Sequence, residues 1–401
     1  MRRPLLLAAV LALCAIAVPA PAQGAGPQLG VDVGACVTPV ADAAFVVLPV
    51  NDGKAFTSNS CLAQQATGTR PVQLFTNGAM PGPGAANWPG DVCANVLSSD
   101  CAARYGAAAA TDALSTVTSS GAQQLARTWW LDVENLNTWA GPTAYNVASI
   151  RAELSTLRSR PDLVAAVGIY SSKAQWQEIA GSDQTLTVPQ WTATPMASYA
   201  TAKTLCQAKT SFTRGPVVMA QYARDASTDG DYACPPRLAT HAPLHSGTPT
   251  VLRGSALPGQ TVTIQTHQPD RSIHVYTALT GADGTWSRTV TLKYSGTIAV
   301  GNDAGSTTGQ ISVDPTLTVH VAGARCGVTA TGTVTPRWPG QLVTVVVSGG
   351  RSAVVGTNVH GAWHAAIAEP CGSRISVQAR VGRTRWASTG RSRSPILRTL
   401  G

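Results

Sequence analysis

Two carboxylates, Asp132 and Glu134, lie two positions apart at the end of an apolar, aromatic run that begins at Trp129. On a β-strand, residues i and i+2 point to the same face, so both side chains would project into one site. Two acids in one pocket do not ionise independently, so one can act as a general acid while the other stays a carboxylate. The same spacing also occurs by chance at exposed strand ends. The apolar neighbours favour the first interpretation, because they predict a buried strand, and residues 135–139 look like a loop that opens a binding cleft.

The first half of the chain alternates short apolar strands with Ala-rich helical stretches. We expect strands at residues 29–33, 44–50, 71–75, 128–133, 165–170, 187–192 and 217–222, and helices near residues 105–119 and 144–158. This alternation predicts an α/β fold, with a parallel sheet and crossover helices closed or nearly closed into a TIM-like (β/α) barrel. In such a barrel the functional residues lie at the C-terminal ends of the strands, and Asp32, Asp132 and Glu134 fall at or near that end of an apolar run.

From about residue 243 the chain changes to short Val-, Thr- and Ile-rich strands with Gly-rich turns. Residues 251–264 match residues 330–345, and residues 282–286 match residues 359–363. We therefore predict two all-β sandwiches in tandem, resembling bacterial immunoglobulin-like modules. Trp286 and Trp363 occupy matching positions and are expected in the two cores, with glycan stacking as the alternative. The predicted domains are a signal peptide (1–22), the barrel (23–240), one sandwich (241–314) and a second with a basic C-terminus (315–401).

The N-terminal residues have the pattern of a secretory signal: basic residues, an apolar run at 5–18 and small residues at 19–22. That run is too short for a bilayer, and no later stretch reaches the roughly 20 apolar residues of a membrane-spanning helix. We therefore expect a soluble, secreted protein that is extracellular or associated with the cell wall.

Eight of the nine cysteines lie outside the predicted signal. An even number, without Cys-x-x-Cys or paired His spacing, favours disulfides over zinc in an exported protein. We predict the pairs Cys36–Cys61, Cys93–Cys101, Cys206–Cys234 and Cys326–Cys371. The last pair is the best motivated because it lies alone in its own module; eight cysteines formally allow 105 connectivities.

The net charge of +9 is unevenly distributed. Residues 23–240 carry 13 Lys and Arg against 15 Asp and Glu, and residues 241–401 carry 14 against 5. A cationic exported module suits an anionic cell-wall polymer, although the arginines could equally serve only to keep an Ala-, Gly- and Val-rich protein soluble. We do not predict nucleic-acid binding, because the arginines lack the interleaved aromatic residues of a single-strand binder.

Six short segments occur together in the first domain, in this order. They are Gly-Val-Asp-Val at 30–33, Asn-Asp-Gly at 51–53, Leu-Asp-Val-Glu at 131–134, Gly-Ile-Tyr-Ser at 168–171, Gln-Trp-Thr-Ala at 190–193, and Gln-Tyr at 221–222 followed by Asp-Gly-Asp at 229–231. On these segments, roughly residues 30–234 resemble the glycoside hydrolase family 25 lysozymes, and more closely the secreted actinobacterial proteins similar to that family. The resemblance implies a barrel that cleaves the β-1,4 bond between N-acetylmuramic acid and N-acetylglucosamine in peptidoglycan.

The resemblance also implies roles for individual acids. Glu134 would be the general acid that protonates the leaving oxygen, and Asp132 would stabilise the oxocarbenium-like state or orient the substrate's acetamido group. Asp32 and Asp229 would complete the acidic floor. This chemistry fits retention of configuration, with carboxyl groups about 5 to 5.5 Å apart or with the substrate's own acetamide as nucleophile.

The substrate contacts carry open alternatives. The final acid is ambiguous, because either Asp229 or Asp231 could be the inward one; we favour Asp229. Sugar contacts are expected from Asp52, Trp129, Trp139, Trp191 and Tyr222, although Trp191 could equally be a packing residue.

Two departures from the family pattern keep other functions open. The family's Tyr-His-Phe strand is replaced by Leu-Phe-Thr-Asn at 74–77, and Asp52 is shorter than the usual Glu. A non-catalytic glycan- or wall-binding barrel is therefore the second hypothesis, and a hydrolase of another polysaccharide is the third. No metal site and no cofactor are predicted: all seven histidines lie at or after residue 241, and His360 and His364 fall on a predicted strand and turn. The first domain thus depends on carboxylate chemistry.

Overall fold

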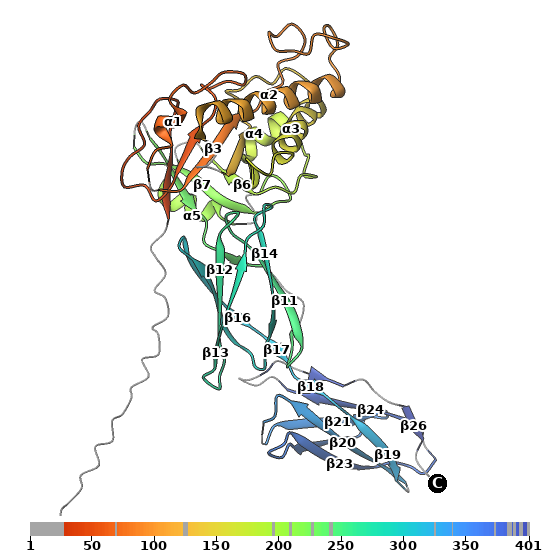
Figure 1. Ribbon diagram of the computed structural model, residues 1–401. Coiled ribbons are helices and arrows are strands. Elements are labelled where there is room, and N and C mark those ends of the chain that lie inside the picture. Colours follow the sequence, from red (N-terminus) through yellow and green to blue (C-terminus); the bar gives the residue numbers. More distant parts are fainter. Residues whose placement is uncertain are drawn as a thin grey trace, which may run out of the picture.

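The computed structural model describes residues 28–398, except for 69, 123–126, 195–196, 208–210, 226–227, 240–243, 325, 339, 373, 383–386, 388–389 and 393–395. The predicted signal peptide lies outside the described residues. A barrel with helices on its outside is followed by two β-sandwiches, arranged one after another (Figure 1). This architecture confirms the predicted fold class. Within the described part of the chain, no helix is long and apolar enough to cross a membrane.

Eight strands pair in sequence order to form a closed barrel. They are β1 (Leu29–Asp32), β2 (Val46–Pro49), β3 (Val72–Asn77), β4 (Thr128–Asp132), β5 (Ala166–Ser171), β6 (Gln190–Thr192), β7 (Val217–Ala223) and β8 (Asp229–Ala233). Neighbours from β1 to β7 are parallel, as the sequence predicts. The last strand was not predicted and is antiparallel to both β7 and β1. Residues 224–228 are too few for the crossover that a parallel β8 would need, so β7 and β8 form a hairpin.

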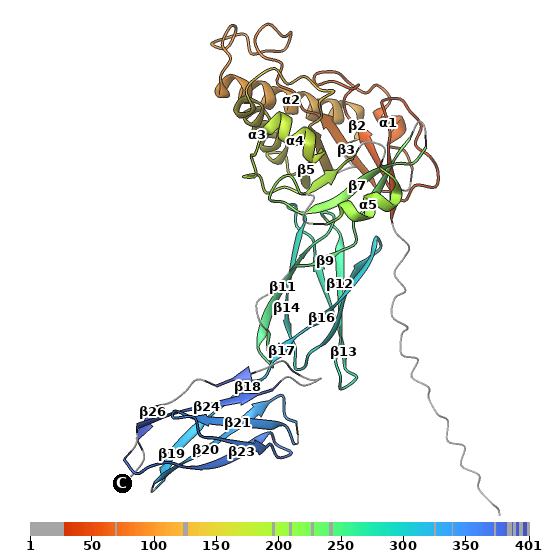
Figure 2. The ribbon, with the colours of Figure 1, turned by 180° about the vertical axis from the view of Figure 1, so that it is seen from behind.

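Five helices are described around the barrel: α1 (Leu62–Gln65), α2 (Ser99–Ser120), α3 (Thr143–Arg158), α4 (Lys173–Ala180) and α5 (Tyr199–Leu205). The two long ones, α2 and α3, lie side by side on the outside (Figures 1 and 2). Their close approach depends on Gly106, where an added Cβ would lie 2.4 Å from the Ser149 carbonyl oxygen. The helices bury the outward-facing side chains of the strands, including Trp129 and Leu131, while Trp130 belongs to the cluster inside the barrel.

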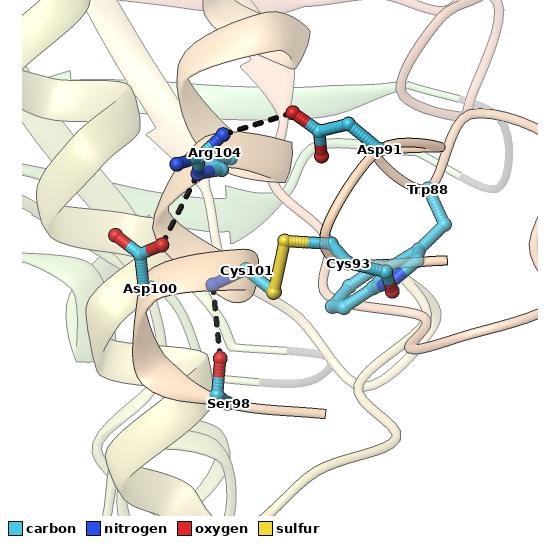
Figure 3. Close-up of polar contacts among 7 residues, drawn as sticks. All are labelled: Trp88, Asp91, Cys93, Ser98, Asp100, Cys101 and Arg104. Carbon is cyan, nitrogen blue, oxygen red and sulfur yellow. Dashed lines mark hydrogen bonds and ion pairs between the residues drawn. A yellow bond between two sulfur atoms is a disulfide. The ribbon is translucent and has the colours of Figure 1, made fainter. Parts of the chain in front are cut away.

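All four disulfides form as predicted: Cys36–Cys61, Cys93–Cys101, Cys206–Cys234 and Cys326–Cys371. The second one fastens residues 78–98, the loop between β3 and α2 that we call the 78–98 loop, to the first turn of α2 (Figure 3). Ser98 caps that helix by accepting a hydrogen bond from the Cys101 N–H at 3.2 Å. Arg104 pairs with Asp91 in the loop and Asp100 in the helix, each at 3.1 Å.

The first sandwich packs one sheet of β9 (Arg237–Leu238), β11 (Pro249–Ser255) and β14 (Thr285–Thr291) against a second sheet. The second sheet contains β12 (Thr261–His267), β13 (Ile273–Leu279), β15 (Gly296–Asn302) and β16 (Gly305–Ile311); β10 (Leu244–His245) pairs with β17 (Val313–Asp314). Because β9 pairs with β11, strands of this sandwich begin three residues before the predicted boundary at residue 240.

The second sandwich contains two sheets built around β20 and β24. Its strands are β18 (Thr316–Leu317), β19 (His320–Ala324), β20 (Gly327–Thr335), β21 (Leu342–Val347), β22 (Ser352–Gly356), β23 (Ala362–Ala368), β24 (Arg374–Val381), β25 (Gly390–Arg391) and β26 (Ile396–Arg398). The two matching segments of the sequence make the same contact in both sandwiches, a Trp paired with a Gly on the neighbouring strand. Trp286 lies opposite Gly254 in the first sandwich, and Trp363 lies opposite Gly332 in the second. Both indoles are buried in the cores, as predicted, because each glycine leaves room for a ring.

The first sandwich closes the end of the barrel opposite the C-terminal ends of β1–β7. Leu257 and Ala304 from its turns belong to the same buried cluster as Val218 and Met219 of β7. Gly284, with a φ of +73°, lies so near the barrel that an added Cβ would be 3.1 Å from Pro189. The cluster inside the barrel therefore includes residues from the turns of the first sandwich.

Candidate active site

Four acids lie on strands at one end of the barrel interior. Asp32 ends β1 and Asp132 ends β4, so both lie at the C-terminal ends of parallel strands. The antiparallel β8 places Asp229 opposite Asp32 and Asp231 opposite Gly30. Residues directly opposite on paired strands share a face, as do residues i and i+2 of one strand. The closure of the barrel thus brings together acids that are almost 200 positions apart in the sequence.

The sequence left open whether Asp229 or Asp231 faces inward. A shift of one residue was expected to exchange them, but they are two positions apart and therefore face the same side. They differ in depth instead. Asp229 is exposed at the mouth of the barrel, whereas Asp231 has 0% of its surface exposed.

Asp132 is held by amide side chains. The Asn77 Nδ2 donates a hydrogen bond of 2.7 Å to its Oδ2, and the Asn137 Nδ2 donates one of 3.0 Å to its backbone oxygen. Its Oδ1 has no hydrogen-bond partner and only 5% of the residue is exposed. Burial, followed by the charge of Glu134, raises the pKa of Asp132 well above its ordinary value, and the hydrogen bonds from Asn137 and Asn77 lower it in part.

Glu134 lies just beyond β4 and is partly buried. The Trp139 indole N–H donates a hydrogen bond of 2.8 Å to its backbone oxygen, which fixes the start of the loop. Burial raises the pKa of Glu134, whereas hydrogen bonding by Gln175 and Tyr170 lowers it. Asp132 and Glu134 are therefore neighbouring carboxyl groups, and Asp132 is the more buried of the two.

A chain of hydrogen bonds crosses the site from β5 to β1. The Tyr170 hydroxyl donates to the Gln221 Oε1 at 2.7 Å, and the Gln221 Nε2 donates to both oxygens of Asp32 at 3.2 Å. Burial is the largest cause that raises the pKa of Asp32 to about 7; the charge of Asp229 also raises it, and the Gln221 hydrogen bond lowers it. We therefore expect Asp32 to change charge near neutral pH.

Asp231 lies beneath these groups. Burial, with the charges of Asp32 and Asp229, raises the pKa of Asp231 well above its ordinary value, and the Trp191 indole lowers it in part. None of the five acids forms an ion pair with a Lys or Arg among the residues that the structure describes. The site consequently favours protonated carboxyl groups, which can donate protons as well as accept them.

The predicted aromatic contacts divide between the two faces of the barrel. Trp191 lies inside, where its ring centroid is 4.2 Å from that of Tyr170, and Trp139 is partly buried beside Glu134. Trp129 and Tyr222 are not part of the site: each lies on the outer face, because each is one residue away from an inward-facing Trp130 or Gln221. Asp52 is exposed in the loop after β2, where its N–H donates to the Thr57 hydroxyl at 2.9 Å.

Four polar residues of the site were not among the predicted site residues: Asn77, Tyr170, Gln175 and Gln221. Asn77 is the last residue of β3, so the rule that selected Asp32 and Asp132 also applies to it. Gln175 carries no such signal, since it lies in the first turn of α4 and reaches the site only through tertiary packing.

The arrangement supplies proton donors and carboxylates but no evident metal site. Within the described residues, no group of three or more His, Cys, Asp or Glu side chains is arranged to hold a metal ion. A partly buried acid beside a second, more buried acid is suited to protonating the leaving oxygen of a glycosidic bond.

Comparison with known proteins gives one family match. Residues 94–204 match the model described as "Lysozyme-like protein 1", over about a quarter of the chain. That stretch is therefore similar to lysozyme-like proteins, and it contains Asp132 and Glu134 but not Asp32, Asp229 or Asp231. No curated protein matches the chain.

Solved structures show only distant likeness. The spore cortex lytic enzyme SleM of Clostridium perfringens is 9% identical, with 93% of this chain and 98% of that one covered and a TM-score of 0.36. A two-domain fibronectin type-III segment of chicken tenascin is 16% identical, with 41% of this chain and 99% of that one covered and a TM-score of 0.29. A tetra-tandem repeat of a large adhesion protein is 20% identical, with 41% of this chain and 48% of that one covered and a TM-score of 0.22. The match thus spans about half the length of that protein. The fold described above rests on the strand pairing alone.

Proposed function

We propose that the protein is an exported glycoside hydrolase that cleaves the β-1,4 bond between N-acetylmuramic acid and N-acetylglucosamine in peptidoglycan. The observation that carries the proposal is the pair of neighbouring acids Asp132 and Glu134 at the active end of a barrel whose other three acids also have raised pKa values. The similarity of residues 94–204 to lysozyme-like proteins supports the same class of substrate.

In the proposed mechanism, Glu134 protonates the leaving oxygen, because it is the more accessible member of the pair and burial keeps it protonated at higher pH than a free Glu. Asp132, oriented by Asn77, stabilises the oxocarbenium-like state or the substrate's acetamido group. Asp32 and Asp229 contact the sugar from the opposite side of the mouth, and Asp231 supports Asp32 from below.

The second sandwich is proposed to hold the enzyme on an anionic wall polymer. Arg380 and Arg391 lie directly opposite one another on β24 and β25, and both are exposed. Like charges at opposite positions destabilise a sheet, so an anion bound between them would relieve their repulsion. Export is supported by the four disulfides, which persist in oxidising compartments.

The test measures release of reducing ends from purified peptidoglycan by the full-length protein. Glu134→Gln keeps the shape of the side chain but cannot donate a proton, so we expect a loss of at least about 100-fold in rate. Glu178→Gln is the matched control, because Glu178 is an exposed acid on α4 that accepts a hydrogen bond from Asn135. New reducing ends must carry N-acetylmuramic acid; hydrolysis that survives in Glu134→Gln would exclude Glu134 as the acid.

A non-catalytic glycan-binding barrel is the second candidate, and one observation favours it. Burial raises the pKa of Asp132 well above its ordinary value, so this carboxyl keeps its proton to higher pH than a free Asp, and in that form it donates a hydrogen bond to a sugar hydroxyl instead of stabilising a cation. Peptidoglycan that co-sediments with the wild-type protein without any release of reducing ends would support this candidate.

A further inference from the structure

A groove of about 180 Å³ opens beside the acids, between loops that follow three successive parallel strands. Lys54 and Ala55 come from the loop after β2, Pro81 from the 78–98 loop after β3, and Leu136 and Asn137 from the loop after β4. All three loops leave the C-terminal ends of their strands, so the groove lies at the same end of the barrel as the acids.

Asn137 and Gly78 connect the groove directly to Asp132. Asn137 lines the groove and its Nδ2 donates to the Asp132 backbone oxygen, while Asn77 donates to both the Asn137 Oδ1, at 3.3 Å, and the Asp132 carboxylate. The Gly78 N–H donates to the same backbone oxygen at 2.8 Å. An added Cβ at Gly78 would lie 3.1 Å from that oxygen and 3.3 Å from the Trp139 ring. A substrate at Asp132 would therefore have the groove as its immediate neighbour.

Lys54 is the one charged residue among the described residues that line the groove. The part of the chain that the structure describes offers it no ion-pair partner. Its backbone is fixed, since its carbonyl oxygen accepts a hydrogen bond of 2.6 Å from the Thr57 hydroxyl. The other lining residues are uncharged: small or apolar side chains, with Leu136 91% exposed, and the polar Asn87, Tyr105, Asn137 and Thr138. The charges thus separate into five acids in the barrel mouth and one cation in the adjoining groove.

We propose that this groove receives the anionic substituent of the muramic acid unit, and that Lys54 binds its carboxylate. The inference rests on the proposed function and adds how the site would select its sugar. The five acids supply no positive charge for a substrate carboxylate, whereas Lys54 attracts it one loop away. The volume is below the roughly 300 to 1,000 Å³ of pockets for larger ligands, so the groove suits a short substituent.

Two carboxylates of the substrate could occupy this position: that of the lactyl ether itself, or one on the attached peptide. The experiment separates them by measuring the binding of N-acetylmuramic acid, muramyl dipeptide and neutral N-acetylglucosamine to the full-length protein by calorimetry at low salt. The variants are Lys54→Gln and Lys54→Arg, and Lys203→Gln is the matched control because Lys203 lies on α5 on the outside of the barrel.

We expect Lys54→Gln to weaken binding of the anionic ligand about three- to fivefold, the effect of an exposed ion pair, and to leave N-acetylglucosamine unchanged. Lys54→Arg and Lys203→Gln should bind like the wild type. Weakening for N-acetylmuramic acid alone would assign the lactyl carboxylate, because muramyl dipeptide has this group only as a neutral amide. Weakening for muramyl dipeptide alone would assign the peptide carboxylate, and weakening for both would mean that Lys54 binds either carboxylate. Equal affinity of wild type and Lys54→Gln for both anionic ligands would overturn the inference.

The binding assay is independent of turnover, so the two proposals can fail separately. If peptidoglycan is not cleaved but Lys54→Gln still loses its preference for the anionic sugar, the groove inference stands and the hydrolase proposal falls. If cleavage depends on Glu134 and Lys54→Gln binds like the wild type, only the groove inference falls.

Discussion

Individual carboxyl groups in this barrel gain their reactivity from burial without counter-ions. Asp32, Asp132 and Asp231 all have raised pKa values with burial as the largest cause. A group whose folded pKa is raised above its unfolded value binds its proton more tightly in the folded state. Such an acid costs stability as the pH rises from its unfolded pKa to its folded pKa, so the site is maintained at the expense of stability at neutral pH.

Asp32 gives the clearest test of this stability cost, because burial raises its pKa from 3.8 to about 7. The sign follows from proton binding: between these values the folded state holds more protons, so its stability falls with rising pH. Asp32→Asn removes this dependence and should raise the free energy of unfolding at pH 7.5 by about 1–2 kcal/mol, with little change near pH 4. Thermal unfolding of both proteins across this pH range is the measurement.

Asp52→Asn serves as the control for that series, since Asp52 is exposed at the same end of the barrel. It should have the pH profile of the wild type. If Asp32→Asn is no more stable than the wild type at pH 7.5, the Asp32 carboxyl is not strained by its burial.

At the scale of elements, the 78–98 loop is the largest addition to the barrel's active end, and it forms one wall of the groove that contains Lys54. Val92 and Val96 of this loop are 70% and 47% exposed, whereas Met80 and Trp88 are buried in a cluster with Tyr105 of α2. The Cys93–Cys101 disulfide, the Arg104 ion pairs and a hydrogen bond of 2.7 Å from the Trp88 indole to the Cys93 carbonyl hold it as well (Figure 3).

Removing the disulfide with Cys93→Ala and Cys101→Ala should therefore loosen this wall. For a loop of this length the expected loss is about 2–3 kcal/mol of stability. Faster proteolysis within residues 78–98 and weaker binding of muramyl dipeptide are the readouts. The double variant Cys326→Ala and Cys371→Ala, in the second sandwich, should leave both unchanged; equal protease resistance of the 78–98 loop with and without its disulfide would contradict the prediction.

At the scale of the whole molecule, the barrel is open at its active end and closed by the first sandwich at the other. Leu257, 3% exposed, and Ala304, 1% exposed, share a buried cluster with the barrel interior. The Thr307 hydroxyl also donates a hydrogen bond of 2.7 Å to the Pro236 carbonyl where the chain leaves the barrel. The first sandwich thus packs against the end of the barrel and contributes to its buried interior (Figure 2).

Leu257→Ala tests this support. Removing a buried Leu side chain typically costs about 2–5 kcal/mol, and here we expect the barrel, monitored through hydrolysis after heating, to lose stability together with the sandwich. Leu279→Ala is the matched control because Leu279 is 69% exposed in the same sandwich. If the two variants have the same heat resistance, the contact does not stabilise the barrel.

Local patterns alone predicted much of this protein. Period-2 and period-3.6 apolar spacing located seven barrel strands and the two long helices, and the internal repeat located both buried tryptophans. These features follow from the chain itself because strand and helix periodicity depend on neighbouring residues. The same alternation, applied more strictly, separates Trp130 and Gln221 inside the barrel from Trp129 and Tyr222 outside it.

Other features depended on contacts between distant residues. The antiparallel β8 places Asp229 opposite Asp32, and Gln175 reaches Glu134 from a helix. The raised pKa values likewise require the closed barrel, since burial without a cation exists only after all eight strands have paired. The sequence by itself therefore determined which residues can do acid chemistry and which elements carry them. Only the tertiary structure decided how deep each acid lies, which groups hold it and where Lys54 stands beside it, because these depend on strand closure and loop packing.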